Sequence, residues 1–429
     1  MAEEKLTAII VGAGPAGSTA AYVLAKGGHD VVMVERGDSA GCKNMFGGRM
    51  YSHALERVIP GFWEEAPVER AVVRETVTFI HGGRSVSVVC DNPRWAAIPP
   101  HSFTLLRAEF DSWLASKAEE AGAMVACGIR VDDVLMADGK VVGIRAGEDE
   151  MLADVVIAAD GVNSVLAQKA GLAKMFVPSE VAVGVKQVIE MPAAEISRLF
   201  QLGEGEGAVE LFVGDCSRGM QGGGFLYTNK NSVSLGLVVG AAALQRGEAS
   251  PFDMLEDFKA QPRFSRVLEH GEVGEYSAHL VPEAGINMVP KLFGDGMLVV
   301  GDAAGLVLNL GYIVRGMDFA VASGEAAAKA VVEAKSTGDF SRHGLSHYKK
   351  LLDDSFVLRD LTAYRRAPRF LENQRLFEQH PRLATELVSD LFTVDGGPPR
   401  RLGKTVRNRL RGRTIAHLVA DGWRGVRGL

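Results

Sequence analysis

A glycine-rich turn between two apolar runs constrains the fold of this chain more than any other feature. The stretch AIIVGAGPAGSTAAYVLAKGGHDVVMVERG spans residues 8–37. Residues 8–11 predict a buried strand, Gly12, Gly14 and Gly17 follow at GxGxxG spacing, and a helical run comes next. The first glycine permits a tight turn, the second lets the backbone approach a pyrophosphate, and the third lets the helix pack on the strand. The stretch therefore predicts a βαβ unit that binds a dinucleotide at a helix N-terminus.

An acidic residue closes the second β-rich run of this unit. The run VVMVE ends in Glu35, where a carboxylate accepts hydrogen bonds from an adenosine ribose and repels a 2′-phosphate. NAD and FAD share this adenosine half. The stretch alone therefore leaves open whether the cofactor is a nicotinamide or a flavin.

The composition describes a globular protein with more than one structural unit. The chain has 429 residues, of which 47% are hydrophobic, and this length predicts two or three units. No apolar run reaches the ~18 residues that span a bilayer, and the start MAEEKL lacks a signal-peptide profile, so we expect a cytoplasmic location. The cysteines are far apart without a CxxC pair, which predicts unpaired thiols and no metal site: Cys42, Cys90, Cys127 and Cys216.

The net charge of −6 conceals a basic arm at the end of an acidic chain. Residues 400–429 hold nine Lys or Arg and one acid, a local +8, which leaves 38 basic and 52 acidic residues, or −14, on residues 1–399. Large apolar residues recur there at approximately helical spacing: Val406, Leu410, Ile415, Leu418, Val419, Trp423 and Val426. Such an amphipathic arm suits an anionic lipid surface, an acidic partner or the acidic body of its own chain, and the sequence leaves these three open.

The segments that follow interrupt the nucleotide-binding fold. They predict hairpins over 68–90 and 131–145, a strand leading into a helix over 103–121, and a buried strand over 153–158. Residues 181–290 are rich in predicted strands, with one helix near 252–259. A last buried strand over 296–300 then leads into GDAAG and a helix over 318–334.

This order predicts an α/β (α+β) fold, in which an antiparallel β-sheet domain is inserted into a Rossmann-like FAD-binding domain and a helical C-terminal extension follows. The FAD-binding domain is expected over 1–67, 103–180 and 291–339. The β-sheet substrate or quinone domain is expected over 68–102 and 181–290, and the helical region with the basic arm over 340–429.

The late strand with its Gly-Asp pair favours the flavin. In nicotinamide dehydrogenases the nucleotide half is usually contiguous, whereas here MLVVGDAAG places Gly301 and Asp302 almost 290 residues after the first turn. Such an element suits a long, extended cofactor, because a carboxylate can accept hydrogen bonds from ribityl hydroxyls. We therefore expect bound FAD.

Several motifs resemble one group of flavoproteins. The pieces that carry the likeness are GAGPAGSTAA, VERGDSAGCKNMFGGR, LLRAEFDSWLASKAEEAGA, AADGVNS, GGGFLYTN, SAHLVPEAGINM and VGDAAGLVLNLGYIVRGMDFAVASGEAAAKAV. The chain resembles the flavoproteins around p-hydroxybenzoate hydroxylase and geranylgeranyl reductase, and within them the FixC branch of electron-transfer-flavoprotein:quinone oxidoreductases. The first motif is widespread, but GDAAG followed by NLGYIVRGMD is specific to that branch.

The resemblance implies partners as well as FAD. It implies the α and β subunits of an electron-transferring flavoprotein, a small ferredoxin-like iron–sulfur protein, and a membrane quinone, menaquinone or ubiquinone, as acceptor. It also implies electron bifurcation, with one electron sent to a low-potential carrier and the other to quinone. The expected location is cytoplasmic and peripheral on the inner face of the cell membrane, and no nucleic-acid partner is expected.

The resemblance also assigns residues to the cofactor. The adenosine and pyrophosphate are expected at Gly12, Gly14, Pro15, Ala16, Gly17, Glu35 and Arg36. The loop beside the isoalloxazine is expected to contain Cys42, Lys43, Asn44, Gly47, Gly48 and Arg49. Further contacts are expected from Arg107, Asp160, Gly161, Gly301, Asp302, Gly311, Tyr312 and Ile313. A helix beginning near Asp318 would point its positive end at the flavin N1/C2=O edge and raise the potential.

Two of these assignments have plain alternatives. Arg107 reaches the FAD phosphates if the likeness holds, but a surface salt bridge to Glu109 or Asp111 is the alternative. Asp160 and Gly161 close over the pyrophosphate, or simply form the turn at a strand end.

One feature departs from the mitochondrial quinone oxidoreductases, which carry a C-terminal ferredoxin domain with four clustered cysteines. Here the basic arm stands in that place, so any cluster is expected on a separate chain. A small acidic ferredoxin would be attracted to the +8 segment.

No catalytic side chain is assigned, because the flavin carries the redox step. A quinone proton could come from His53, His279, Tyr227 or Tyr312, although solitary residues of these types are more often structural. The apolar residues Ile59, Phe62 and Trp63 either enter the membrane interface near a quinone tunnel or pack in the core. Alternative functions are a prenyl-lipid (geranylgeranyl) reductase, a hydroxylase, and a flavin-loaded electron relay without terminal catalysis.

Overall fold

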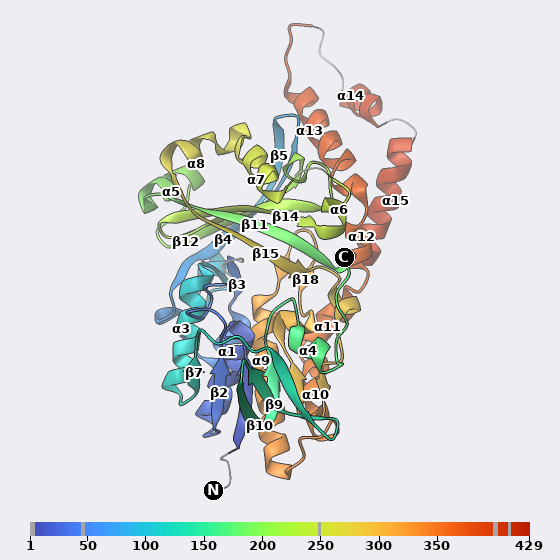
Figure 1. Ribbon diagram of the computed structural model, residues 1–429. Helices are drawn as coiled ribbons and strands as arrows, with labels where there is room; N and C mark the ends of the chain where they lie inside the picture. Colours follow the sequence, from blue (N-terminus) through green and yellow to red (C-terminus); the bar gives the residue numbers. More distant parts are fainter. Residues whose placement is uncertain (1–4, 44–47, 248–249, 398–401, 411–412) are drawn as a thin grey trace.

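The structure is a computed structural model that describes residues 5–43, 48–247, 250–397, 402–410 and 413–429. A mostly parallel sheet of eight strands lies in the lower half of the molecule as drawn in Figure 1. The β-branched run after the N-terminus forms the central strand β1 (Leu6–Val11), which pairs in parallel with β2 (Val31–Val34) and β10 (Asp149–Ala158). The outer members are β7 (Met124–Ala126), β8 (Asp133–Ala137), β9 (Lys140–Ala146), β16 (Phe293–Gly294) and β17 (Met297–Val299). Helix α1 (Pro15–Lys26) packs against α3 (Arg107–Glu120) and α9 (Met317–Thr337). The predicted βαβ unit is confirmed.

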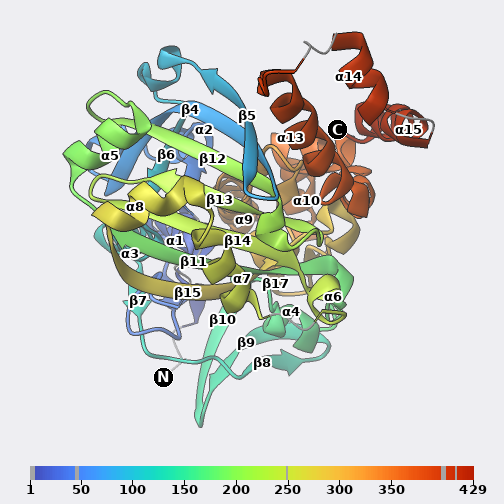
Figure 2. The ribbon, with the colours of Figure 1, turned by 90° about the horizontal axis from the view of Figure 1, so that it is seen from above.

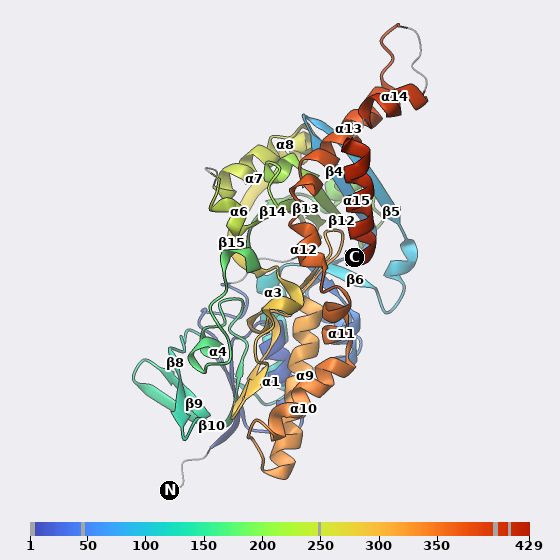
Figure 3. The same cartoon turned by 90° about the vertical axis from the view of Figure 1, so that its right-hand side faces the viewer.

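A second sheet of nine strands lies above the first as a roof (Figures 1 and 3). Its order is β15-β11-β14-β13-β12-β4-β6-β3, with β5 paired to β4. The strands are β3 (Arg49–Tyr51), β4 (Val68–His81), β5 (Arg84–Asp91), β6 (Ser102–Leu105), β11 (Val181–Glu190), β12 (Glu206–Gly214), β13 (Gly222–Thr228), β14 (Ser232–Gly240) and β15 (Glu272–Pro282). Apart from the parallel pair β4–β12, neighbours run antiparallel.

Three helices cover the far side of this roof, seen from above in Figure 2. They are α5 (Ala193–Phe200), α7 (Pro251–Lys259) and α8 (Ser265–His270), whereas α6 (Ala241–Leu244) directly follows the end of β14. The helix predicted near 252–259 is confirmed as α7, but α5, α6 and α8 were not predicted, because they are too short for their periodicity to stand out. Phe212, Phe258 and Phe264 pack edge to face beneath them, with centroids 4.7–5.4 Å apart.

The C-terminal region is helical, as predicted. It contains α10 (His347–Asp354), α11 (Phe356–Ala363), α12 (Ala367–Leu371), α13 (Gln379–Phe392), α14 (Leu402–Arg409) and α15 (Arg413–Gly428). Helix α13 packs on β4 and β5, and α15 packs on α12. Within the described ranges no helix has the length and apolar character needed to cross a bilayer.

Two strands that were assigned to the predicted FAD-binding domain belong to the roof sheet. Strands β3 and β6 hydrogen-bond in the roof, although residues 49–51 and 103–105 were assigned to the nucleotide-binding part. The strand at residues 49–51 is too short for a pattern of alternating apolar residues to predict it. The domain boundaries themselves stay a prediction.

Candidate cofactor site

The glycines of the first turn have two different roles. A Cβ at Gly12, where φ is +106°, would lie 2.3 Å from the Ala159 carbonyl oxygen, and one at Gly17 would lie 1.9 Å from the Gly12 carbonyl oxygen. A Cβ at Gly14 would meet nothing closer than the Arg107 Nη2, at 3.9 Å. Gly12 and Gly17 thus let backbone segments pack together, whereas Gly14 leaves open space in front of the N-terminus of α1.

That space belongs to a cavity of about 690 Å³ between the carboxyl ends of β1, β10 and β17 and the roof. In open α/β sheets this edge is where ligands bind. The predicted site residues on its wall are Gly14, Pro15, Ala16, Gly48, Arg49, Arg107, Gly161, Gly301, Asp302, Gly311 and Tyr312. Segments separated by up to 300 residues therefore meet at one cavity, and their assignment to the cofactor stays a prediction.

Arg107 enters the cavity from the start of α3 as half of a buried ion pair. Its Nε and Nη2 donate to the two carboxylate oxygens of Asp111 at 2.8 and 2.6 Å. The alternative of a surface salt bridge is therefore wrong, because the two side chains are only 9% and 1% exposed. The pair holds the guanidinium plane beside Gly14, where it can meet a phosphate.

Asp302 lies on the wall of the same cavity. Gly301 has a φ of +59°, and its N–H donates to the Ser323 hydroxyl at 2.9 Å, which fixes the turn after β17. Burial raises the pKa of Asp302, and the charge of Arg107 opposes this change. A carboxylate in this position can accept hydrogen bonds from sugar-type hydroxyls.

Glu35, the acid predicted to bind the adenosine ribose, already accepts hydrogen bonds from the protein backbone. Glu35 accepts from the N–H groups of Ala13 and Gly37 at 3.0 and 2.7 Å, and so ties the end of β2 to the glycine turn. Its two oxygens keep further lone pairs for a ribose. Arg36 and Lys43 are exposed, and Cys42 packs against Gly37.

Asp160 lies just behind the cavity wall formed by its neighbour Gly161. One carboxylate oxygen accepts from the Leu166 N–H at 3.0 Å, while Oδ1 is buried and has no hydrogen-bond partner among the described residues. A bound group with a donor would satisfy that atom. The predicted residues Asn44 and Gly47 lie outside the described residues.

An aromatic pair lies beside Gly48 on another part of the cavity wall. A Cβ at Gly48 would lie 2.5 Å from the ring of Tyr227, which stacks on Phe225 at 5.0 Å between centroids. Opposite, the hairpin β18 (Leu308–Asn309) and β19 (Val314–Arg315) leads into the N-terminus of α9, as predicted. The Ile313 carbonyl closes this hairpin on the Leu310 N–H at 2.9 Å and is not on the cavity wall.

Three of the four candidate proton donors lie on the cavity wall. His279, Tyr227 and Tyr312 are on the cavity wall. His53 is not among the residues of that wall; its Nε2 lies 3.2 Å from the Asp318 carboxylate beside Arg315, which favours the structural alternative. Burial lowers the pKa of His279 to about 4, with positive charges nearby contributing, so the ring is neutral at ordinary pH.

Sequence reasoning missed two groups on this wall. Glu283 accepts from the Asn309 side-chain N–H at 2.9 Å, and burial raises its pKa to about 7 although that hydrogen bond opposes the change. Phe370, Leu371, Leu376 and Phe377 reach the cavity from the C-terminal region. No sequence pattern links these residues to the glycine turn.

The pKa of Glu283 makes folding stability depend on pH. The folded carboxyl holds its proton up to about pH 7, whereas the unfolded one loses it near 4.5. We expect the free energy of unfolding to fall between these pH values by at most about 3 kcal/mol from this group. Urea unfolding of the wild type and Glu283→Gln should show this difference, and identical pH profiles would contradict the assignment.

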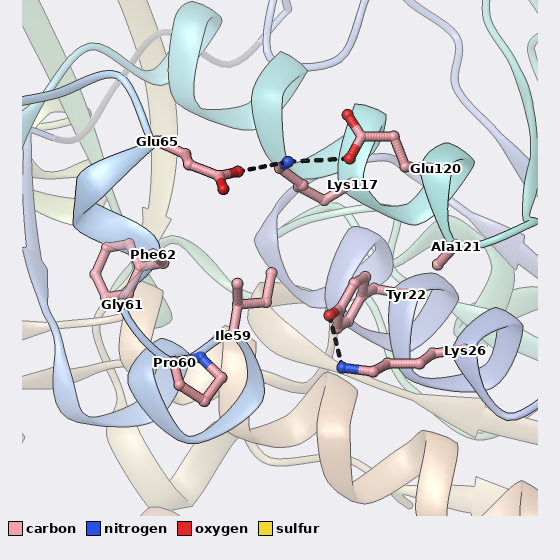
Figure 4. A pocket seen from close by; sticks show the side chains of 10 residues that line it. All are labelled: Tyr22, Lys26, Ile59, Pro60, Gly61, Phe62, Glu65, Lys117, Glu120 and Ala121. Carbon is pink, nitrogen blue, oxygen red and sulfur yellow. Dashed lines mark hydrogen bonds and ion pairs between the residues drawn. The ribbon is translucent and has the colours of Figure 1, made fainter.

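A second hollow, of about 390 Å³, lies on the surface between α1, α3 and residues 59–65 (Figure 4). Lys117 there forms ion pairs with Glu65 and Glu120 at 2.7 and 3.0 Å. Phe62 is 1% exposed and packs edge to face on Trp63 and Phe103. Of the two interpretations of this apolar stretch, core packing is the one that the structure supports.

Comparisons with known proteins identify the family of this chain. A profile described as "FAD binding domain" matches residues 5–308, and one described as "ETF-QO/FixC family C-terminal domain" matches residues 367–429. Protein FixC of Escherichia coli (strain K12) is 48% identical over 426 residues, covering 99% of both chains. The chain belongs to the FixC family. A FixC protein of Bradyrhizobium diazoefficiens is 38% identical over 100% of this chain and 99% of its own, and a probable electron transfer flavoprotein-quinone oxidoreductase of E. coli K12 is 46% identical over 100% of both.

This FixC-family chain is therefore an FAD-dependent oxidoreductase, as the resemblance implied. Solved structures show the same fold at lower identity. A geranylgeranyl bacteriochlorophyll reductase-like protein of Thermoplasma acidophilum matches with a TM-score of 0.72 at 21% identity over 97% of this chain and 99% of that one. A flavin-dependent brominase matches at 0.64 and 16% over 90% and 92%. The open space at Gly14, in front of the N-terminus of α1, fits the pyrophosphate of FAD.

Proposed function

We propose that this FixC-family chain transfers electrons from an electron-transferring flavoprotein to a membrane quinone, with a separate ferredoxin-like subunit, in an electron-bifurcating complex. One observation carries the proposal: the wall of the same cavity includes the apolar side chains of Phe370, Leu371 and Phe377. Bound FAD supplies the redox chemistry by taking up and releasing electrons. The apolar end of the same cavity would hold the quinone ring.

The residues of this chain then have defined tasks. Gly14 and the N-terminus of α1 bind the negative pyrophosphate, and Arg107, held by Asp111, adds a fixed positive charge. Asp302 orients the sugar-like chain. The N-terminus of α9, at Met317 on the cavity wall, contributes partial positive charge at the ring end, which favours electron uptake.

We propose further that α15 holds the protein peripherally on the inner face of the cell membrane. Ile415, Val419, Trp423 and Val426 are 48%, 67%, 64% and 80% exposed and recur at spacings of four, four and three residues. At 100° per residue these four lie within one narrow stripe. Arg427 is exposed beside it, which is the pattern of a helix lying on an anionic lipid surface.

The other face of α15 is attached to the chain itself (Figure 3). Asp421 is 3% exposed and accepts from Arg375 at 2.5 and 2.7 Å, with His380 at 3.1 Å. A Cβ at Gly425 would lie 3.3 Å from the ring of Phe370, a residue of the cavity wall. Lipid under the exposed stripe would therefore be next to the apolar end of the cavity, where a lipid-soluble quinone has to enter.

Vesicle binding tests this surface. The triple variant Ile415→Ser, Val419→Ser, Trp423→Ser should lose at least about 3 kcal/mol of binding free energy to phosphatidylglycerol-containing vesicles, because each buried apolar side chain contributes about 1.5–3 kcal/mol. Cosedimentation measures it. Ile98→Ser with Met175→Ser, which also removes exposed apolar groups, is the control and should bind like the wild type. Unchanged binding of the triple variant would exclude α15 as the lipid contact.

Reconstitution tests the proposed reaction. The FAD-loaded chain, with its flavoprotein and ferredoxin-like partners, should reduce a soluble quinone analogue to the quinol. Saturation of geranylgeranyl lipids instead would favour the prenyl reductase, and rapid oxidation of NAD(P)H by the chain alone, stimulated by an aromatic compound, would favour a hydroxylase. If the flavoprotein reduces the bound flavin and no quinol forms, the chain is an electron relay and the proposal is wrong.

A further inference from the structure

We propose that Glu283 is the acid that protonates the quinone in this cavity, and that Asn309 is the residue that positions it; this inference rests on the proposed quinone reduction. Nothing in the glycine turn or the flavin contacts requires a carboxyl group here. Its place, partner and surroundings carry the argument.

Two distant elements hold Glu283 on the cavity wall. Residue 283 follows β15 directly, and its backbone N–H donates to the Glu180 carbonyl oxygen at 2.8 Å, which anchors the segment to the neighbouring roof connection. Its Oε2 accepts from the Asn309 Nδ2 of β18 at 2.9 Å. Both side chains line the cavity. The carboxyl group is thus fixed between the roof and the hairpin that leads into α9.

The surroundings of Glu283 favour the protonated form. Within the described ranges the carboxyl group forms no ion pair, although Arg246, His279, Tyr312 and Glu372 line the same cavity. Burial accordingly raises the pKa of Glu283 to about 7. A group that titrates near ambient pH is efficient in proton transfer, because it both holds and releases a proton there. His279, with a pKa lowered to about 4, is a neutral imidazole near pH 7 and lacks the acidic proton of an imidazolium.

The step balances with the proposed reaction. A quinone needs two electrons and two protons to become a quinol, and the electrons come from the reduced cofactor. The O–H bond of the Glu283 carboxyl breaks and an O–H bond forms on one quinone oxygen. Water in the cavity returns a proton to the Glu283 carboxylate, and solvent supplies the second proton of the quinol. Asn309 donates to the carboxylate that remains, which keeps its free oxygen aimed into the cavity.

Two acceptors separate proton transfer from electron transfer. Ferricyanide takes electrons without protons, whereas a soluble quinone analogue needs both. In the FAD-loaded Glu283→Gln variant we expect quinone reduction to fall by about 10²–10⁴-fold, the usual contribution of a general acid, with ferricyanide reduction unchanged. Glu272→Gln removes an exposed carboxyl at the start of β15, away from the cavity wall, and should change neither. Equal losses with both acceptors would overturn the proposal, as would wild-type quinone turnover in Glu283→Gln.

A titration gives a readout that does not depend on turnover. The infrared band of a protonated carboxyl should disappear as the pH rises through about 7 in the wild type and be missing in Glu283→Gln. In Asn309→Leu it should disappear at higher pH, because the hydrogen bond that lowers the pKa is gone. No such band in the wild type would overturn the proposal. A normal titration without any quinone reduction by the wild type would instead show that the proposed function, and the role resting on it, is wrong.

Discussion

Gly14→Leu is expected to abolish FAD binding while the protein stays folded. The backbone at Gly14 has a φ of −78°, which any residue adopts, and its Cβ would face open cavity with only the Arg107 Nη2 at 3.9 Å. A leucine side chain would fill the space that the pyrophosphate needs at the N-terminus of α1. We expect FAD affinity to drop by at least about 10³-fold, or about 4 kcal/mol. The FAD-free protein should unfold within about 1 kcal/mol of the wild type.

Gly28→Ala is the matched control in the same βαβ unit. Gly28 has a φ of +77° and nothing within 4 Å of its Cβ position, so the variant carries backbone strain away from the cavity. It should lose about 1 kcal/mol of stability and still bind FAD. Absorbance titration with FAD and urea unfolding measure the two effects. FAD binding by Gly14→Leu at wild-type affinity would show that the pyrophosphate lies elsewhere.

Asp111→Ala is expected to destabilise the fold more than other single changes near the site. It leaves the Arg107 guanidinium buried beside the cavity without the carboxylate that accepts two of its hydrogen bonds. Removing one partner of a buried pair costs about 3–5 kcal/mol, because the remaining charge is poorly solvated. Urea unfolding of the FAD-free protein should show a loss of that size. FAD affinity should fall as well, since Arg107 loses its fixed orientation.

Two comparison variants separate charge from packing. Glu109→Ala, at an exposed position on the same helix, should change stability by no more than about 0.5 kcal/mol. The double variant Arg107→Met, Asp111→Leu removes both charges and should recover most of the stability without recovering FAD affinity. A loss below about 1 kcal/mol in Asp111→Ala would contradict the role of the pair.

Local patterns in the sequence predicted the parts of the site that depend on local geometry. The spacing of Gly12, Gly14 and Gly17 between a strand and a helix predicted the first turn, because each glycine answers a requirement of nearby backbone. The strand before Gly301 and the helix after Gly316 were predicted in the same way. The hairpins over 68–90 and 131–145 follow from alternation around glycine turns.

Long-range convergence is what the sequence could not predict. Glu283 and Asn309 are 26 residues apart in the sequence. They meet because Glu283 follows β15, the edge strand of the roof, and Asn309 lies in the hairpin that leads into α9. Phe370 belongs to a helical region with no motif, yet it stands between α15 and the cavity. The burial of the Arg107 and Asp111 pair was equally invisible, since a spacing of four residues on a helix fits an exposed pair as well.

One measurement tests the central claim, that a single cavity between the two sheets holds FAD at its glycine-lined end and quinone at its apolar end. It is an experimental structure of the FAD-loaded chain with a bound quinone analogue. We predict the FAD pyrophosphate at Gly14 and Arg107, and the analogue against Phe370 and Phe377 with one oxygen in hydrogen-bond reach of Glu283. An analogue bound outside this cavity, or FAD filling it to the Phe370 wall, would contradict the account.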